Sequence, residues 1–216
     1  MPYQEESVEH LMEIGNGANF SVPGSGKTTI TYASLSRWRD DGTAQKIIVI
    51  GPTASFLPWE EEYVGCFGKT PRSCRVSGDF ASKFHELGDS FDLFLMHHNT
   101  AMYRQWELRN FMKRWDTVLI IDESHYIKSP ALKRWASTAI IIAPYAKHRI
   151  ILSGTPMPNN AKDLWTQITF LWPQHHPLGN QIIYNNYVKK HGVGKYQSIL
   201  NSLFCRIKKN TLAYDI

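Results

Sequence analysis

The chain has 216 residues, of which 43% are hydrophobic, 12% aromatic and 20% charged, with 24 basic residues against 19 acidic ones. A domain of this length buries about 70% of its unfolded surface, and this composition excludes intrinsic disorder and collagen-like or low-complexity classes. No apolar run approaches the roughly 20 residues of a membrane span, and the polar, acidic first ten residues do not form a signal peptide. We therefore expect a soluble globular domain with no membrane partner.

The cysteines indicate the cellular compartment, and the placement of the charges indicates the kind of partner. Cys66, Cys74 and Cys205 form no C-x-x-C pair, so we expect no disulfide scaffold, no zinc site and a reducing, cytoplasmic compartment. The whole positive excess lies after residue 173, where six basic residues accompany the single acid Asp215. Such a patch suits a phosphate-rich partner, although a solvated surface explains it equally well.

Short apolar runs rich in β-branched residues alternate along the chain with longer segments of helical period. The runs KIIVIG, TVLIID and RIILSG are apolar throughout, which is typical of strands covered on both faces. The predicted strands are 19–22, 46–51, 73–77, 91–97, 117–121, 148–153 and 204–208. The predicted helices are 5–14, 27–39, 56–64, 80–87, 101–114, 129–143 and 161–172. This alternation predicts a three-layer α/β domain with a central, mainly parallel sheet; only residues 173–200 are weakly patterned.

The segment Ser21–Thr29, SVPGSGKTT, follows a predicted strand and opens a predicted helix, which is the context of a P-loop. Gly24 and Gly26 allow backbone N–H groups to close around phosphate oxygens, and the helix N-terminus adds the positive end of its dipole. We expect Lys27 to reach the β and γ phosphates and Thr28 to offer its hydroxyl to magnesium. The alternative is a glycine-rich turn with a solvated lysine. The residues expected to bind ATP in this loop are Pro23, Gly24, Ser25, Gly26, Lys27, Thr28 and Thr29.

The stretch TVLIIDESH places Asp122 at the end of an apolar strand, with Glu123 beside it. In a parallel sheet this strand end faces the same crevice as the P-loop. We expect Asp122 to hold magnesium and Glu123 to act as the general base toward the attacking water. Alone, an Asp-Glu pair more often marks the acidic first turn of a helix. Together with the P-loop it predicts an ATPase whose catalytic residues are Lys27, Asp122 and Glu123.

Several further stretches resemble a known family. DESH is similar to the DEAH form of motif II in superfamily-two helicases, and LSGTPMPNN with DLWTQITFLWP (152–173) resembles motif III of the Swi/Snf family of DNA-translocating ATPases. IVIGPTASFLPWEEEY (48–63) resembles the motif Ia of that family, and the PYQ of residues 2–4 resembles its adenine-reading motif. LFCRIKKNTL (203–212) resembles the basic stretch that closes its first lobe.

The resemblance implies that residues 1–212 form the first RecA-like lobe of a motor that uses ATP and magnesium to move along double-stranded DNA. It implies a second, C-terminal RecA-like lobe, missing from this chain, that supplies an arginine finger, so that the isolated lobe hydrolyses ATP only near background. Gln4 is implied to read the adenine. The residues implied to couple the ATP site to the DNA are His125, Ser153 and Thr155, and those implied to contact DNA are Thr53, Ser55, Thr100, Arg206, Lys208 and Lys209.

Other interpretations stay open beside this one. The small hydroxyl residues at strand ends are equally explained as ordinary helix caps, and Trp59 is expected to be a core residue rather than a base-stacking platform. Ser124, which replaces the Ala or Gly of the family, is expected to leave the chemistry unchanged. The rival functions are a strand-separating helicase, the motor of a restriction system, and a non-hydrolysing module that binds nucleic acid and keeps ATP as a structural ligand.

Overall fold

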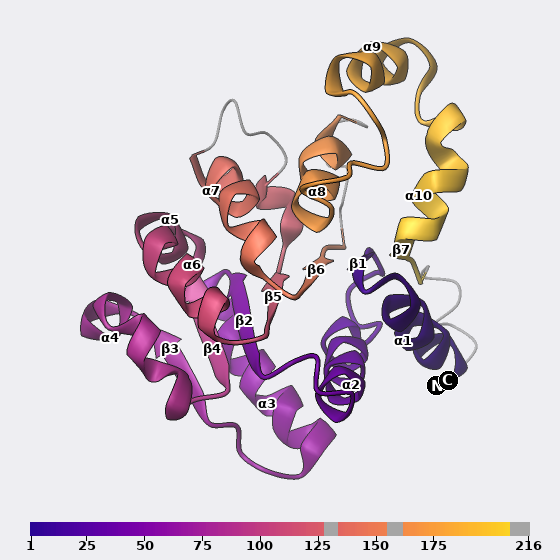
Figure 1. Ribbon diagram of the computed structural model, residues 1–216. Helices are drawn as coiled ribbons and strands as arrows, with labels where there is room; N and C mark the ends of the chain where they lie inside the picture. The colour runs from indigo at the N-terminus through magenta and orange to yellow at the C-terminus, as the bar shows by residue number, and fades with distance from the viewer. Residues whose placement is uncertain (128–133, 155–161, 208–216) are drawn as a thin grey trace.

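Seven parallel strands form one sheet at the centre of the computed structural model, which describes residues 1–127, 134–154 and 162–207, with the backbone alone at residues 79 and 80. The strands lie in the order β3-β4-β2-β5-β6-β1-β7 (Figure 1). Their bounds are β1 Asn16–Asn19, β2 Lys46–Gly51, β3 Ser73–Val76, β4 Leu93–His97, β5 Thr117–Ile121, β6 His148–Leu152 and β7 Phe204–Cys205. All pairings between them are parallel, so the predicted α/β sheet is confirmed.

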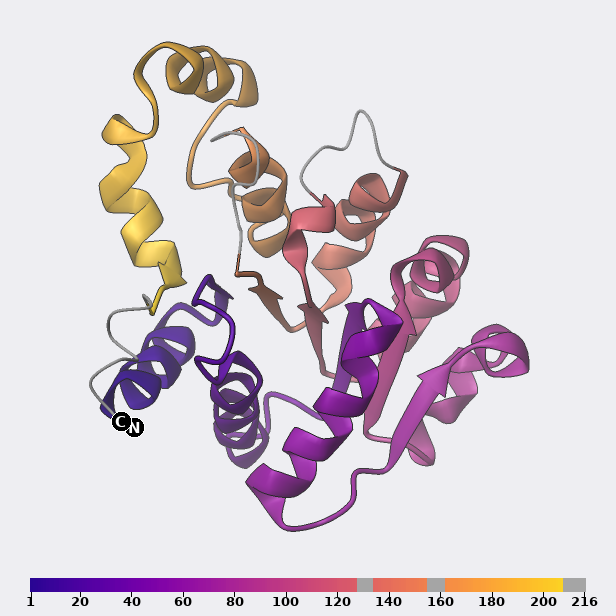
Figure 2. The same cartoon turned by 180° about the vertical axis from the view of Figure 1, so that it is seen from behind.

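Ten α-helices connect or flank these strands in the described part of the chain. Their bounds are α1 Pro2–Ile14, α2 Lys27–Asp40, α3 Phe56–Phe67, α4 Gly78–Ser82, α5 His98–Tyr103, α6 Gln105–Arg114, α7 Arg134–Ile142, α8 Asp163–Leu171, α9 Gln181–His191 and α10 Gln197–Leu203. Helices α2 and α3 cover one face of the sheet, and α6, α7 and α8 cover the other (Figures 1 and 2). The three predicted layers are therefore present.

The central strands are apolar throughout because both of their faces are covered. Every residue of β2 and of β5 is buried, and the register places Ile48 between Phe94 of β4 and Leu119 of β5. Alternate residues of each strand point into one or the other of two hydrophobic clusters, one on each face of the sheet. This arrangement brings the carboxyl ends of β1, β2, β5 and β6 to one edge of the sheet, where the chain turns into its loops.

The strand predicted over residues 19–22 is misplaced, because β1 ends at Asn19. Beyond that residue the chain leaves its partner β6, and Phe20 donates its N–H to the carbonyl oxygen of Cys205 at 2.9 Å. The apolar and small residues after Asn19 therefore belong to the glycine-rich loop and to its contact with the segment after β7.

Two predicted helices have the wrong form. The helix predicted over 101–114 is divided into α5 and α6, because Arg104 adopts φ −115° and ψ 27°, outside the helical region. The helix predicted over 80–87 is divided between α4 and a following 3-10 helix. The other predicted helices are confirmed with ends shifted by up to three residues; for 129–143 and 161–172 this refers to the residues that the structure describes.

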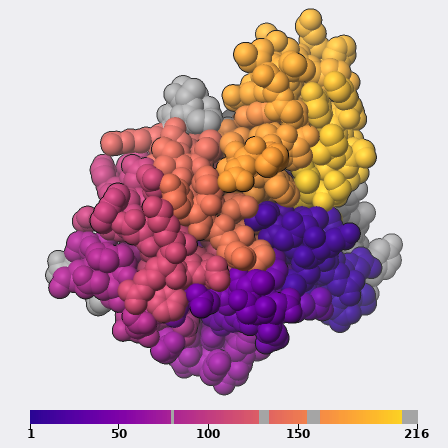
Figure 3. All heavy atoms as spheres, viewed as in Figure 1, coloured from indigo at the N-terminus to yellow at the C-terminus, as the bar shows by residue number. Residues whose placement is uncertain are grey.

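The weakly patterned segment after residue 173 contains two helices that the sequence did not predict, α9 and α10. Asn180 caps α9, its Oδ1 accepting the N–H groups of Ile182 and Ile183 at 2.9 and 3.3 Å. Within α9 only Tyr184 and Val188 are buried, so the helix has little apolar periodicity to detect. Figure 3 shows this orange-to-yellow part projecting beyond the rest of the molecule. Among the described helices, none combines the length and the apolar character that crossing a membrane requires.

Candidate nucleotide-binding site

The loop between β1 and α2 has a backbone that suits phosphate binding. It runs from Phe20 to Gly26, and Lys27 is the first residue of α2. Gly24 and Gly26 have φ values of 80° and 77°, in the left-handed region where a side chain causes strain. At Gly26 a Cβ atom would also collide with the side-chain amide of Gln4. The predicted succession of strand, glycine-rich loop and helix is present, and the first N–H groups of α2, which have no intrahelical partner, face this loop.

Polar side chains anchor the base of the loop. Asn19 accepts the N–H of Ser21 at 3.1 Å, and the Oγ of Ser21 accepts the N–H of Ile207 at 2.8 Å. Ser25 is 1% exposed, and its Oγ has no hydrogen-bond partner among the residues that the structure describes. A buried hydroxyl without a partner is costly, so this group is a donor available to an anion in the loop.

Lys27 is half-buried beneath the loop. Its Nζ donates to the carbonyl oxygens of Ser21 at 3.1 Å and Val22 at 3.3 Å. Burial lowers the pKa of the Lys27 amine, while the negative charges of Glu123 and Asp122 act in the opposite direction. The fold has therefore brought Lys27 and the acidic pair, far apart in the sequence, near enough for their charges to influence one another.

Asp122 follows the last residue of β5, and both of its carboxylate oxygens are hydrogen-bonded. Its Oδ1 accepts the backbone N–H of Glu123 at 3.0 Å, and its Oδ2 accepts the indole Nε1–H of Trp59 at 3.1 Å. Trp59 is 1% exposed, which confirms its predicted place in the core. Gly51 lies close by: a Cβ at that position would stand 3.0 Å from the Cβ of Asp122, so a side chain there would crowd Asp122.

Glu123 is held in an unusual conformation. Its φ is 55°, and among the described residues it is the only one other than glycine with a positive φ. Such a conformation costs about 1–3 kcal/mol and is concentrated at functional sites. Its Oε2 lies 3.0 Å from Nδ1 of His125, so the histidine that sequence reasoning assigned to coupling sits directly against the expected base.

Ser124 points the other way, into the protein. It is fully buried, and its Oγ donates to the Oε1 of Gln167 at 2.7 Å. Gln167, also fully buried on α8, donates its Nε2 to the carbonyl oxygen of Asp163 at 3.1 Å. Sequence reasoning missed this link, although a glutamine among the mainly apolar residues of the helix predicted over 161–172 was a signal that some buried polar group needs a partner.

Ser153 and Thr155, the residues predicted to couple the ATP site to the DNA, follow β6 in the sequence. Ser153 is fully buried, and its N–H donates to the carbonyl oxygen of Asn19 at 3.2 Å, directly before the P-loop. Thr155 lies outside the described residues. The end of β6 therefore touches the start of the loop through the backbone.

The residues predicted to contact DNA fall into two groups. Thr53 is exposed and Ser55 donates its Oγ to the carbonyl oxygen of Pro52 at 2.9 Å, both just after β2, and Thr100 lies in α5 just after the neighbouring strand β4. Arg206 follows β7, four strands away from β2, and lines a hollow against α1. Lys208 and Lys209 lie outside the described residues. The structure brings the hydroxyl residues together and leaves Arg206 apart from them.

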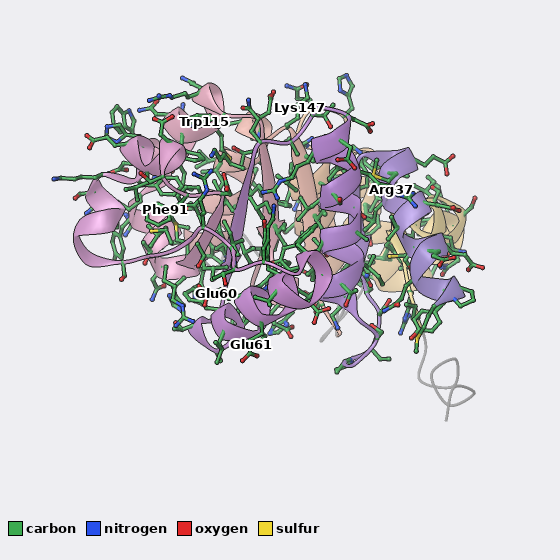
Figure 4. The ribbon with its side chains drawn as sticks, turned by 90° about the horizontal axis from the view of Figure 1, so that it is seen from below. Arg37, Glu60, Glu61, Phe91, Trp115 and Lys147 are labelled. Atoms are coloured by element: carbon green, nitrogen blue, oxygen red, sulfur yellow. The ribbon has the colours of Figure 1, made fainter. Side chains whose placement is uncertain are left out.

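A small groove adjoins the P-loop between α1 and α2. Its volume is about 200 Å³, and it is lined by Met1, Gln4, Glu5 and Val8 of α1 and by Thr29, Ile30, Ala33 and Arg37 of α2. Figure 4 shows Arg37 on α2, on the side toward α1. The Nε2 of Gln4 donates to the carbonyl oxygen of Ser25 at 3.4 Å, while the hydroxyl of Thr29 is directed to Glu62 of α3. The groove thus has apolar walls and a few polar groups, which suits a flat heteroaromatic ring.

Comparison with known proteins gives one consistent result. The model of a family described as the SNF2-related domain matches residues 3–213. The helicase SWR1 of Mycosarcoma maydis is 28% identical over 188 residues, covering 80% of this chain and 10% of that protein. The ATP-dependent helicase fft1 of Schizosaccharomyces pombe is 23% identical over 214 residues, covering 89% of this chain and 22% of that protein.

Solved structures agree with the sequence matches. The SWI2/SNF2 ATPase core of Sulfolobus solfataricus in complex with dsDNA superimposes with a TM-score of 0.82 at 26% identity, covering 98% of this chain and 45% of that one. A second structure, the SWI2/SNF2 ATPase core domain of the same organism, superimposes with a TM-score of 0.78 at 23% identity. The chain thus spans less than half of these solved cores and a small part of the helicases that it resembles.

Proposed function

Because the chain belongs to the SNF2-related domain family of helicase-like ATPases, we propose that it is the ATP-binding first lobe of a motor that translocates on double-stranded DNA. The observation that carries this proposal is that the glycine-rich loop with Lys27, after β1, and the pair Asp122 and Glu123, after β5, lie at the same edge of the sheet. A glycine turn alone needs no such acidic pair, whereas nucleotide hydrolysis needs a phosphate cradle, a metal ligand and a base.

In this proposal the phosphates lie in the loop after β1. The N–H groups of residues 24–29, the buried hydroxyl of Ser25 and the amine of Lys27 are the donors that hold them. Lys27 exchanges its two bonds to the carbonyls of its own loop for phosphate oxygens. These bonds therefore keep the amine in place until the nucleotide arrives.

The hydroxyl of Thr28 and the carboxylate of Asp122 are the proposed magnesium ligands, since hydroxyl, carboxylate and water oxygens are the donors that this ion prefers. Bound there, magnesium would offset the charge of the phosphates. Asp122 suits this role because both of its oxygens are already oriented by fixed donors, the Glu123 N–H and the Trp59 indole.

Glu123 is the proposed general base, orienting water and taking its proton. Its Oε2 lies 3.0 Å from Nδ1 of His125, and its backbone has a positive φ of 55°. The proposed place for the adenine is the groove between α1 and α2, where Gln4 would exchange its weak 3.4 Å bond to Ser25 for the edge of the base.

The movement along DNA is proposed to need a second RecA-like lobe. The chain covers 45% of a SWI2/SNF2 core solved with dsDNA, which supports both the DNA partner and the need for a further lobe. Because an arginine finger is worth about 10³–10⁵ in rate, the lobe alone should bind ATP and hydrolyse it only near background.

Calorimetric titration with Mg-ATP and a hydrolysis assay, each with and without duplex DNA, test this proposal. We expect binding with no appreciable turnover, and a loss of affinity of about 10- to 100-fold in Lys27→Ala, since one charge-assisted hydrogen bond contributes about 1.5–3 kcal/mol. Lys190→Ala is the matched control, because Lys190 is an exposed lysine of α9 remote from the loop. Equal affinity of both variants for Mg-ATP would overturn the nucleotide site, and strong DNA-stimulated turnover by the native chain would overturn the half-motor.

A further inference from the structure

Trp59 has one polar atom, and that atom is directed at Asp122. The residue lies on α3 within the hydrophobic cluster between α2, α3 and the sheet, and it is 1% exposed. Its indole Nε1–H donates to the Oδ2 of Asp122 at 3.1 Å. A fully buried tryptophan usually needs only some partner for its N–H; here that partner is the carboxylate proposed to hold magnesium.

The indole is held in place from behind by α2. The hydroxyl of Tyr32 donates to the carbonyl oxygen of Trp59 at 2.7 Å, and the two rings meet edge to face with centroids 5.2 Å apart. Tyr63 and Phe67 pack against the same Tyr32 ring at 5.4 and 5.7 Å. Because α2 begins at Lys27, one rigid aromatic cluster joins the helix of the P-loop to the donor that contacts Asp122.

This donor completes the orientation of the carboxylate. The Glu123 N–H occupies one site on Oδ1 and the indole occupies one site on Oδ2. A carboxylate has about four acceptor sites, so two remain for water or metal, in a plane that the protein has set. Without the indole, Asp122 could turn about its Cβ–Cγ bond, and the free sites would no longer have one direction.

We propose that Trp59 is a positioning residue that orients Asp122 for the magnesium–nucleotide complex. This inference rests on the proposed function and adds a residue that contacts neither the nucleotide nor the metal. Hydrogen-bond partners behind a metal ligand typically contribute about 10- to 100-fold to metal affinity, and we expect the effect of Trp59 to fall in that range.

The test compares Trp59→Phe with Trp38→Phe. Trp38 is a second buried tryptophan of the same cluster, 3% exposed, but its ring stacks on His148 with centroids 4.2 Å apart, away from Asp122. Each variant is titrated with ATP in the presence of magnesium and in the presence of a chelator. We expect Trp59→Phe to lose about 10- to 100-fold in affinity for Mg-ATP while its affinity for metal-free ATP is unchanged. Trp38→Phe should keep the magnesium dependence of the native chain even if it unfolds more easily.

Asp122→Asn separates failure of this inference from failure of the proposed function. If Asp122→Asn binds Mg-ATP as the native chain does, Asp122 is not a metal ligand and the proposed function is wrong at this residue. If Asp122→Asn loses the magnesium dependence but Trp59→Phe retains it in full, the positioning role alone is overturned.

A second measurement covers the case in which Trp59→Phe does not fold. The native chain has seven tryptophans, whose indole N–H resonances can be followed by ¹⁵N–¹H NMR in the presence of ATP. We expect one of them to shift when magnesium is added, and that shift to be absent in Asp122→Asn. No magnesium-dependent indole shift in the native chain would overturn the inference.

Discussion

Ser124 shows that one residue inside a motif can have a role different from that of its neighbours. The two acidic residues before it face the P-loop, whereas Ser124 turns inward and bonds Gln167 on α8. Sequence reasoning expected the serine to leave the chemistry unchanged. Its position adds a structural role to this expectation: its hydrogen bond joins the end of β5 to α8.

Replacing Ser124 by alanine should lower the free energy of unfolding by about 0.5–1.5 kcal/mol, because the buried hydrogen bond from Ser124 to Gln167 is lost. Urea denaturation measures the change. Ser202→Ala is the control, since Ser202 is exposed and its Oγ bonds only its own helix; we expect a change within about 0.5 kcal/mol. The double variant Ser124→Ala/Gln167→Leu should recover part of the loss. A cost for Ser124→Ala no larger than that of the control would contradict the link.

Two half-buried histidines, His148 and His176, also join separate elements. The ring of His148, at the start of β6, lies 3.0 Å from the carbonyl oxygen of Gly15 and 3.3 Å from the hydroxyl of Thr43, and it stacks on Trp38. It therefore connects the ends of α1 and α2 to the sheet. Burial lowers the pKa of His148, and the neighbouring charges of Lys147 and Arg149 act in the same direction, against the Gly15 carbonyl.

His176 connects α8 to the segment that leads to α9. It stacks on Trp165 with centroids 3.6 Å apart, its Nε2 lies 3.2 Å from the carbonyl oxygen of Trp165, and its Nδ1 accepts the N–H of Leu178 at 3.2 Å. Because Nδ1 accepts, the proton is on Nε2 and the ring is neutral. Burial lowers the pKa of His176 below its ordinary value of 6.5.

Stability should therefore fall as the solution becomes acidic. In the unfolded chain both histidines take up a proton near pH 6.5, whereas the folded chain resists protonation until lower pH. The stabilisation is complete above about pH 6.5 and is lost as the pH drops toward the folded pKa values. Urea midpoints at pH 7.5 and 5.5 measure this loss, and His176→Phe, which keeps a stacking ring, should reduce the difference between them. An unchanged difference in that variant would show that His176 does not contribute.

Among the helices and strands, sequence patterns describe poorly those that have few buried residues. Helix α9 buries two side chains and projects from the molecule, so it leaves no apolar stripe in the sequence. The division of the helix predicted over 101–114 depends on the backbone of Arg104, which no periodicity reveals. In contrast, β2 and β5 are buried along their whole length, and β5 ends where the sequence predicted.

For the whole molecule, we propose that a second lobe would complete the site at the edge of the sheet that holds Lys27, Asp122 and Glu123. The solved SWI2/SNF2 cores are more than twice as long as the chain. The hydroxyl residues after β2 and β4 lie at that edge; Arg206 also follows a carboxyl strand end, but its strand, β7, is four strands away from β2, and it lines a hollow against α1. We propose that the hydroxyl residues contact DNA and that Arg206 faces a second lobe.

Glu123→Gln tests the base in a motor that carries both lobes. The substitution keeps the size of the side chain and removes the proton acceptor, so ATP binding should be unchanged and hydrolysis should fall by about 10²–10⁴-fold, the usual contribution of a general base. Binding by calorimetry and DNA-stimulated phosphate release measure the two effects. Turnover at the native rate would show that another group accepts the proton.

The sequence alone determined the class of fold, the P-loop and the acidic pair at the end of β5, because each depends on residues adjacent in the chain. Strand burial, glycine conformation and helix starts are local consequences of composition and spacing. Only the tertiary structure decided which side chains support this site. The Trp59–Asp122 and Ser124–Gln167 bonds join residues 63 and 43 positions apart. The groove beside Gln4 and the separation of Arg206 from Thr53 likewise depend on how whole elements pack, since no local pattern specifies the distance between side chains on different strands and helices.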